Sequence, residues 1–153
     1  MTTRSQRIID TLLPNARPWA DACFAALNAH AAASGHTVEY LSGTRTFTQQ
    51  AALWAQGRTT PGKRVTNSRP GSSYHNYGVA WDIGVFKDGH YLGNSPLYDQ
   101  LGRIGEALGL EWGGRWHSIH DGPHYQVNTG KTVQQLMALH RADKPIPVPI
   151  YRP

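Results

Sequence analysis

The sequence SYHNYGVAWD, at residues 73–82, is the most informative stretch of this chain of 153 residues. It has the pattern S-x-H-x-x-G-x-A-x-D. About forty residues later, DGPHY at residues 121–125 adds a second histidine with a carboxylate three positions before it. Imidazole and carboxylate groups are ligands of Zn²⁺, and three protein ligands leave the fourth tetrahedral position open for a water molecule. The two stretches together predict a catalytic zinc site.

We expect His75, Asp82 and His124 to be the three ligands of one Zn²⁺ ion. A hydrolytic zinc site also needs a base that takes a proton from the water and an acid that gives one to the departing amine, and one carboxylate can do both. Asp121 is the candidate for that role. A single histidine is more often an ordinary core or surface residue, but the spacing and the glycines favour a site.

A competing ligand pair is His120 and His124, which stand four residues apart like the histidines of the helical H-E-x-x-H zinc proteases. Here the intervening residues are Asp121, Gly122 and Pro123. Proline lacks the N–H and clashes with the preceding helical turn, so the segment is predicted to be a turn before a strand. We therefore expect His120 to support the ligands, to contact the substrate or to lie simply at the surface.

The chain around these residues has the pattern of a sheet. Residues 78–86 are predicted to form a strand, with a hairpin turn at residues 87–90 through the Asp-Gly pair. Residues 124–127 are predicted to form a second strand. The site is therefore expected at one end of a sheet.

The chain resembles the zinc peptidases that include the VanX- and VanY-type D-alanyl-D-alanine hydrolases. It is more similar still to the L-alanyl-D-glutamate endopeptidases found as phage endolysins. The resemblance covers about residues 41–127. Its blocks are SGTRT (42–46) with QQAALWAQGR (49–58), then PGK (61–63) and VTN (65–67) leading to SYHNYGVAWD (73–82), and finally LEWGGRW (110–116) with DGPHY (121–125).

The resemblance implies the same zinc ligands and the same base as the spacing does. It further implies that Arg45 stabilises the tetrahedral oxyanion or binds a substrate carboxylate, tasks for which a guanidinium is well shaped. Ser73 is expected to order the ligand loop or to donate a hydrogen bond to the substrate. Both Ser73 and His120 are thus candidate substrate-binding residues.

Other signals fail on inspection. Residues 57–63 have the G-x-x-x-x-G-K skeleton of a phosphate-binding loop, but Arg64 replaces the required Ser or Thr. The sequence has no G-x-S-x-G motif, and its single cysteine, Cys23, lies in an alanine-rich amphipathic stretch. Nucleotide binding and serine or cysteine hydrolysis therefore have no support.

Composition predicts where the protein acts. The formal net charge is +5, which favours anionic partners such as the bacterial envelope. The basic residues are scattered along the sequence, so we expect no nucleic-acid partner. No apolar segment has the length of a membrane span or of a signal peptide. We expect a monomer without stable membrane insertion, made in the host cytoplasm and released to the cell wall through a holin-type pore.

The expected fold is α+β, a single compact domain with a small, mainly antiparallel sheet and flanking helices, as in the hedgehog and D,D-peptidase folds. Residues 1–143 would form the catalytic domain and residues 144–153 a proline-rich extended tail. Residues 58–72 are predicted to be a loop beside the cleft. Helices are expected at 18–34, 46–56, from 95 to about 108, and at 131–141, and a further strand at 36–44. Thr46 and Gln49 have the spacing of a capping box at the start of the second helix.

These expectations combine into a zinc-dependent peptidoglycan hydrolase that cuts the stem peptide at the L-alanyl-D-glutamate bond, as a phage or prophage endolysin. One alternative is a D,D-carboxypeptidase or dipeptidase of the same zinc class. Another is a non-catalytic cell-wall-binding module. The presence of all three ligands and the acid argues against the binding module.

Overall fold

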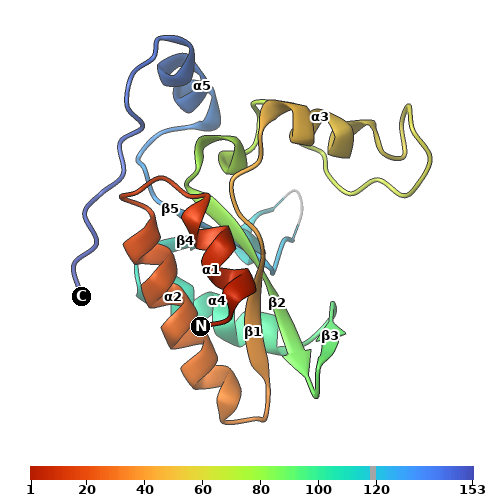
Figure 1. The fold of residues 1–153 in the computed structure, drawn as a ribbon, viewed down its shortest axis with the longest axis vertical. Helices are drawn as coiled ribbons and strands as arrows, with labels where there is room; N and C mark the ends of the chain where they lie inside the picture. The colour runs from red at the N-terminus through yellow and green to blue at the C-terminus, as the bar shows by residue number, and fades with distance from the viewer. Residues whose placement is uncertain (118–119) are drawn as a thin grey trace.

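The structure, a computed structural model, describes residues 1–117 and 120–153. Helices and strands are interspersed along the chain, and one sheet connects the strands of the described residues (Figure 1). The elements are α1 (Thr3–Asp10), α2 (Arg17–Ala32), β1 (Thr37–Ser42), α3 (Phe47–Ala55), η1 (Tyr74–Tyr77), β2 (Ala80–Lys87), β3 (His90–Leu92), α4 (Leu97–Ala107), β4 (Leu110–Trp112), η2 (Gly113–Arg115), β5 (His124–Val127) and α5 (Val133–Arg141).

The sheet has the strand order β1-β2-β5-β4, and every pair in it is antiparallel. The short strand β3 also pairs with β2, through the hairpin at Asp88 and Gly89. Both turn residues have positive φ, 50° and 77°, as the Asp-Gly signal predicts. The predicted α+β fold with a small antiparallel sheet is confirmed.

The two faces of the sheet differ because side chains alternate along each strand. One face is apolar and packs with α1, α2 and α4 into the main core; its strand residues are Val38, Tyr40, Trp81, Ile83, Val85, Leu110, Trp112, Tyr125 and Val127. The strand residues between them point to the opposite face, which we call the open face. There Asp82 is paired across the strands with His124, and Glu111 with Gln126. The polar residues of the chain's most informative motifs therefore lie on the open face.

The helix α3 and the loop after it project away from the sheet (Figure 1). We call residues 47–72 the arm. Thr46 and Gln49 form the predicted capping box at the start of α3, with each side chain bonded to the other's backbone N–H. The buried Gln50 donates to the carbonyl of Ser68 at 2.9 Å and so fastens the returning loop to α3.

The elements that the sequence analysis did not predict include α1 and β4. α1 covers β1, and its buried Ser5 accepts a hydrogen bond from the backbone N–H of Tyr40. The three-residue strand β4 completes the sheet next to β5. Both elements are short, with eight and three residues, and a sequence pattern of that length does not distinguish a helix or a strand from a loop.

The tail, residues 144–153, has neither helix nor strand and lies against α2. The Trp19 indole N–H donates to the carbonyl of Pro149 at 2.8 Å, and the rings of Trp19 and Tyr151 meet edge to face. Val148 packs against the main core. None of the helices in the described part of the chain is long and apolar enough to cross a membrane.

Candidate active site

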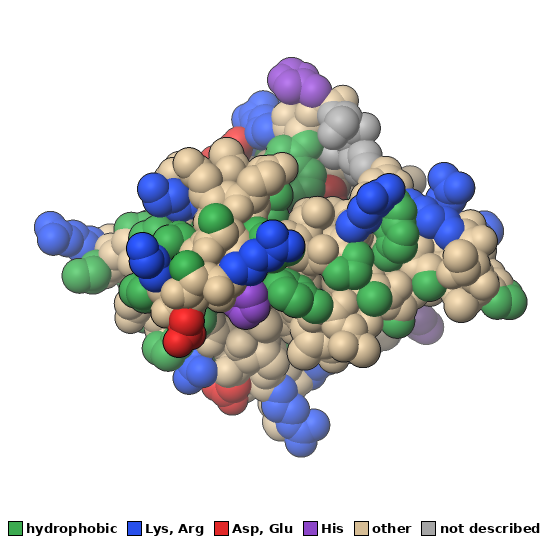
Figure 2. Space-filling model, turned by 90° about the horizontal axis from the view of Figure 1, so that it is seen from above, with side chains coloured by type: hydrophobic (Ala, Val, Ile, Leu, Met, Phe, Trp, Pro, Cys, Tyr) green, Lys and Arg blue, Asp and Glu red, His purple; other side chains and the backbone are tan. Residues whose placement is uncertain are grey.

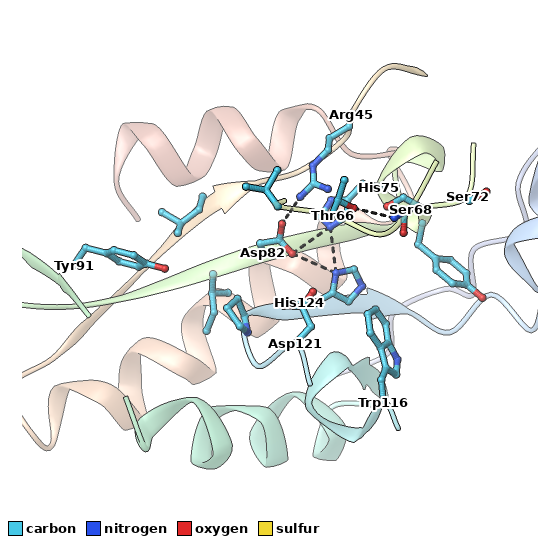
Figure 3. Close-up of a pocket in the computed structure, with 16 residues that line it drawn as sticks. Arg45, Thr66, Ser68, Ser72, His75, Asp82, Tyr91, Trp116, Asp121 and His124 are labelled. Carbon is cyan, nitrogen blue, oxygen red and sulfur yellow. Dashed lines mark hydrogen bonds and ion pairs between the residues drawn. The ribbon is translucent and has the colours of Figure 1, made fainter. Parts of the chain in front are cut away.

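A cleft of about 500 Å³ opens over the open face of the sheet, beneath η1. Arg45 enters it from the chain after β1, His75 from η1, Asp82 from β2, and Asp121 and His124 from the start of β5 (Figure 3). The structure thus brings together five residues that are up to 79 positions apart in sequence.

Three donor atoms in this cleft form a nearly equilateral triangle. His75 Nε2 lies 3.2 Å from Asp82 Oδ1 and 3.2 Å from His124 Nδ1, and the latter two atoms are 3.3 Å apart. Ligands bonded to zinc at about 2.0–2.1 Å with tetrahedral angles are separated by about 3.3 Å. Within the described residues, these three side chains are the group that could hold a metal ion, and their spacing fits zinc.

The protonation of His75 is fixed by the backbone. Its Nδ1 donates to the carbonyl of Gly43 at 2.7 Å, so Nε2 carries the free lone pair that points into the triangle. η1 ends at Gly78, which has φ 70°, and this left-handed residue turns the chain directly into β2. His75 and Asp82 are therefore held on two connected elements.

The protonation of His124 is fixed by hydrogen bonds that run from His124 through Gln126 to Glu111. The ionised Glu111 can only accept, so the amide NH₂ of Gln126 faces it at 2.8 Å, and the amide oxygen of Gln126 faces His124 Nε2 at 3.0 Å. His124 Nε2 must then carry the proton, and Nδ1 is left free to face His75 and Asp82. Gln126 is 2% exposed, which excludes water as a competing partner.

Asp82 is shared between the triangle and Arg45. Its Oδ1 faces the two histidines, while its Oδ2 accepts from Arg45 Nη2 at 2.5 Å. Arg45 is itself oriented by a bond from Nε to Ser42 Oγ at 3.1 Å. Burial would raise the pKa of Asp82, but the electrostatic attraction of its charged form to the two histidine rings and the hydrogen bonds with them outweigh burial and hold that pKa well below its ordinary value.

Asp121 lies beside the triangle, and its backbone holds it there. Its N–H donates to the carbonyl of Gly113 at 3.1 Å, and its own carbonyl accepts from the N–H of His124 at 3.2 Å. A side chain at position 113 would collide with Asp121, because a Cβ there would lie 2.6 Å from the Asp121 carbonyl oxygen. Burial, and then the nearby charge of Asp82, raise the pKa of the Asp121 carboxyl group. A raised pKa suits a carboxylate that must both take and return a proton.

The two candidate substrate-binding residues lie in different places. Ser73 is nearly buried and lines the cleft next to His75. His120 is exposed and faces a separate hollow, where it lies 3.7 Å from Asp99. Of the three expectations for His120, its position matches the surface residue.

The comparisons with known proteins identify the family. A family model described as D-alanyl-D-alanine carboxypeptidase, of peptidase family M15, matches residues 66–127. The peptidoglycan L-alanyl-D-glutamate endopeptidase CwlK of Bacillus subtilis is 40% identical over 113 residues, which cover 67% of each chain. The chain belongs to the M15 peptidase family. It is therefore a metallopeptidase.

Solved structures of other peptidases share the fold of this M15 peptidase. The L-Ala D-Glu endopeptidase ChiX of Serratia marcescens superimposes with a TM-score of 0.56 at 20% identity, covering 85% of this chain and 90% of its own. The D,D-pentapeptidase VanY of a VanB-type resistance cassette, solved with Zn(II), gives a TM-score of 0.53 at 17% identity, covering 88% and 81%. At these identities the likeness concerns the fold.

Two site residues of this M15 peptidase were not among the sequence predictions. Glu111 lies in the LEWGGRW block but had no role assigned to it, and Gln126 lies just after the DGPHY block; neither contacts the triangle of donor atoms except through His124. The available signal was strand alternation, because Gln126 stands two residues after His124 and therefore points to the same face. The pairing of β4 with β5, which brings Glu111 opposite, was not foreseen.

Proposed function

We propose that the protein is a zinc-dependent peptidase that cuts the stem peptide of bacterial peptidoglycan at the L-alanyl-D-glutamate bond. The observation that carries the proposal is the triangle of His75, Asp82 and His124 donor atoms, at 3.2–3.3 Å, with the carboxylate of Asp121 beside it in an open cleft. The 40% identity to CwlK supports the choice of bond.

In this proposal His75, Asp82 and His124 hold one zinc ion. Zinc, when bound, polarises the scissile carbonyl and makes a water molecule acidic. Asp121 takes a proton from the attacking water as the new carbon–oxygen bond forms. The same carboxyl group then gives that proton to the amide nitrogen as the carbon–nitrogen bond breaks, so the products are a carboxylic acid and an amine, which ionise to a carboxylate and an ammonium group.

Arg45 stabilises the negative charge that develops on the carbonyl oxygen. Two of its donors are already used by Ser42 and Asp82, which fixes the plane of the guanidinium. The remaining N–H groups are free, among the described residues, to donate to the oxyanion. The bond to Asp82 also keeps that carboxylate turned with its other oxygen towards the histidines.

The shape of the cleft supports an endopeptidase over a D,D-carboxypeptidase. Tyr91 and Trp116 line the cleft on opposite sides of the triangle and are 52% and 37% exposed (Figure 3). Such exposed rings offer contact surface to a peptide that extends in both directions from the scissile bond. A carboxypeptidase needs instead a closed cationic pocket for a terminal carboxylate.

The same proposal includes a role in bacteriolysis, as a phage or prophage endolysin acting at the anionic cell envelope. The motif resemblance supports this role. Expression of the chain together with a holin in a bacterial host tests it. Lysis that requires both genes is the expected result, and lysis by the holin alone to the same extent contradicts it.

The proposed reaction is tested with Asp121→Asn, which keeps the shape of the residue and removes the base. Purified peptidoglycan is digested with each zinc-loaded protein, and the products are analysed by mass spectrometry. The wild type is expected to create new L-alanine carboxyl ends and D-glutamate amino ends. Asp121→Asn should hold as much zinc and be about 10²–10⁴-fold slower. Asp99→Asn, the same change outside the cleft, is the matched control and should behave as the wild type.

Two results contradict the proposal in different ways. Release of D-alanine by the wild type would identify a D,D-carboxypeptidase. No cleavage by a wild type that carries zinc would identify a binding module.

A further inference from the structure

The active-site cleft does not end at Asp121. A second groove, of about 440 Å³, runs on from it and is lined by residues 64–68 of the arm together with Trp116 and Asp121. The active-site cleft and this groove share five lining residues: Val65, Thr66, Ser68, Trp116 and Asp121. The arm is therefore one wall of a single extended cleft.

The arm brings positive charge to this cleft and no negative charge. Residues 40–81 contain four arginines and one lysine but neither aspartate nor glutamate. On the arm side of the face seen in Figure 2, on the right, Lys and Arg side chains are visible and acidic side chains are not. The arm thus carries basic residues without acidic ones to one side of the cleft.

The arm cations are not equivalent. Arg58 is committed to the arm itself, because its guanidinium lies 3.5 Å from the ring centroid of Trp54 and donates to two backbone carbonyls. Arg69 lies over the same ring at 5.3 Å. Arg64 lines the groove, is exposed, and has no hydrogen bond or ion pair with any residue that the structure describes.

We propose that Arg64 binds the carboxylate of the acidic residue next to the scissile bond, on the side of the leaving amine; this deepens the proposed function and rests on it. A guanidinium binds a carboxylate through two parallel N–H donors. The hydroxyl of Thr66 accepts from the N–H of Ser68 at 3.1 Å, which leaves its own hydrogen free to donate. In an L-alanyl-D-glutamate substrate the free carboxylate belongs to the glutamate, whose nitrogen is the leaving amine.

The groove suits a single carboxylate better than a polyanionic wall polymer. Of the described side chains that line it, Arg64 is the one cation and Asp121 is an anion. A chain of phosphates running along the groove would contact the Asp121 carboxylate, and the two negative charges would repel each other. A single carboxylate at Arg64 leaves Asp121 to the reaction.

The test uses two peptides that differ in one group, the α-carboxylate of the D-glutamate residue or its carboxamide. The zinc-loaded wild type is expected to cut the acid with a kcat/KM about tenfold above that of the amide, the usual size of a charge-assisted hydrogen bond. Arg64→Gln should lower kcat/KM for the acid to near that for the amide, so that the preference of about tenfold is lost. Lys63→Gln removes the neighbouring exposed cation, which lies outside the groove, and should keep the preference.

Two results overturn the inference. One is an unchanged acid preference in Arg64→Gln. The other is an equal loss of the acid preference in Arg64→Gln and Lys63→Gln, with no difference between these proteins and the wild type at high salt. That result would indicate that the total positive charge of the arm attracts a polymeric anion.

Failure of the proposed function is recognised separately, because the wild type would then cut neither peptide. In that case calorimetric binding of the two peptides to zinc-loaded Asp121→Asn, with and without Arg64→Gln, decides the question. Tighter binding of the acid that requires Arg64 supports the subsite, and equal binding of the two peptides overturns it.

Discussion

Two walls of the same cleft are built in opposite ways. On the open face of the sheet, His75, His124 and Gln126 are 2–4% exposed, and each is oriented by a hydrogen bond to a fixed partner. On the arm, Arg64 and Val65 are exposed, and the loop that carries them is held to α3 mainly by Arg58 and Gln50.

The difference follows from what each wall has to bind. A metal ion tolerates little error in ligand position and requires deprotonated donors, so the tautomer of each histidine must be fixed in advance. An exposed carboxylate on a flexible peptide can be bound by a long, positively charged side chain whose position is less strictly fixed than that of a metal ligand. We therefore expect substitutions behind the triangle to change metal affinity, and substitutions in the arm to change substrate binding at constant metal affinity.

The largest expected effect concerns the chain from His124 through Gln126 to Glu111. Gln126→Leu removes the acceptor that fixes the His124 tautomer and should weaken zinc binding about 10- to 100-fold. Glu111→Gln should act in the same direction but less, because an amide at position 111 no longer dictates which end of Gln126 faces His124. Zinc affinity is measured by competition with a chelating indicator at fixed pH.

Exchanging the two side chains sharpens this prediction. In the double variant Glu111→Gln with Gln126→Glu, the new carboxylate at position 126 accepts from His124 Nε2 and from the new amide at position 111. His124 Nε2 is therefore again a donor, as in the wild type. Zinc affinity should return at least to that of the wild type. Gln100→Leu is the control, because it breaks an exposed histidine–glutamine pair with His30 far from the cleft. Equal zinc affinity in all these variants would show that the hydrogen bonds from His124 through Gln126 to Glu111 do not affect zinc binding.

The sequence predicts well those features that depend on neighbouring residues. The capping box of Thr46 and Gln49, the Asp88-Gly89 hairpin and strand β5 each rest on local chemistry, and the structure contains all three. The roles of His75, Asp82, His124, Asp121 and Arg45 stay predictions, although the structure brings all five residues together.

The features that the sequence does not predict depend on contacts between distant segments. The tautomer of His75 is set by the carbonyl of Gly43, 32 residues away, and no pattern along the chain signals that bond. The approach of Glu111 to Gln126 requires the pairing of a three-residue strand. The position of His120 depends on which way a turn faces, and its neighbours Gly122 and Pro123 do not specify this.

A smaller effect is expected from Arg58→Lys in the arm. An ammonium group cannot cover the Trp54 ring and also donate to the carbonyls of Trp54 and Thr66, as the planar guanidinium does. Hydrogen exchange of the amides in residues 57–68 should become about tenfold faster, the size expected for one lost stacked hydrogen-bonding group.

Zinc affinity should stay unchanged in Arg58→Lys, while KM for an acidic peptide rises. Arg69→Lys is the matched control, because the guanidinium of Arg69 lies farther from the same ring and has no hydrogen bond to a described residue. A loss of zinc in Arg58→Lys would show that the two walls of the cleft are not independent.

The smallest effect is expected from Glu106→Gln, at the edge of the cleft. Glu106 on α4 accepts from Arg115 Nε and Nη2 at 2.8 and 3.0 Å, and Arg115 precedes the cleft residue Trp116. The hydrogen bonds from Arg115 lower the pKa of Glu106 below its ordinary value of 4.5. The pair therefore stabilises the fold above pH 4.5, and this contribution is lost as the pH falls through the lower pKa of the folded state.

Both side chains of the pair are largely in water, with 64% of Arg115 and 30% of Glu106 exposed, so solvent screens most of the attraction. Glu106→Gln should lower Tm by only about 1 °C at pH 7 and by nothing measurable once the pH lies well below the lowered pKa of the folded state. If kcat/KM falls by more than this small loss of stability explains, the ion pair holds Trp116 in place for the substrate. If activity is unchanged, Trp116 is held by its contact with the His124 ring, whose centroid lies 4.7 Å from that of Trp116. The buried residues of the open face would then also fix the position of this aromatic side chain at the edge of the cleft.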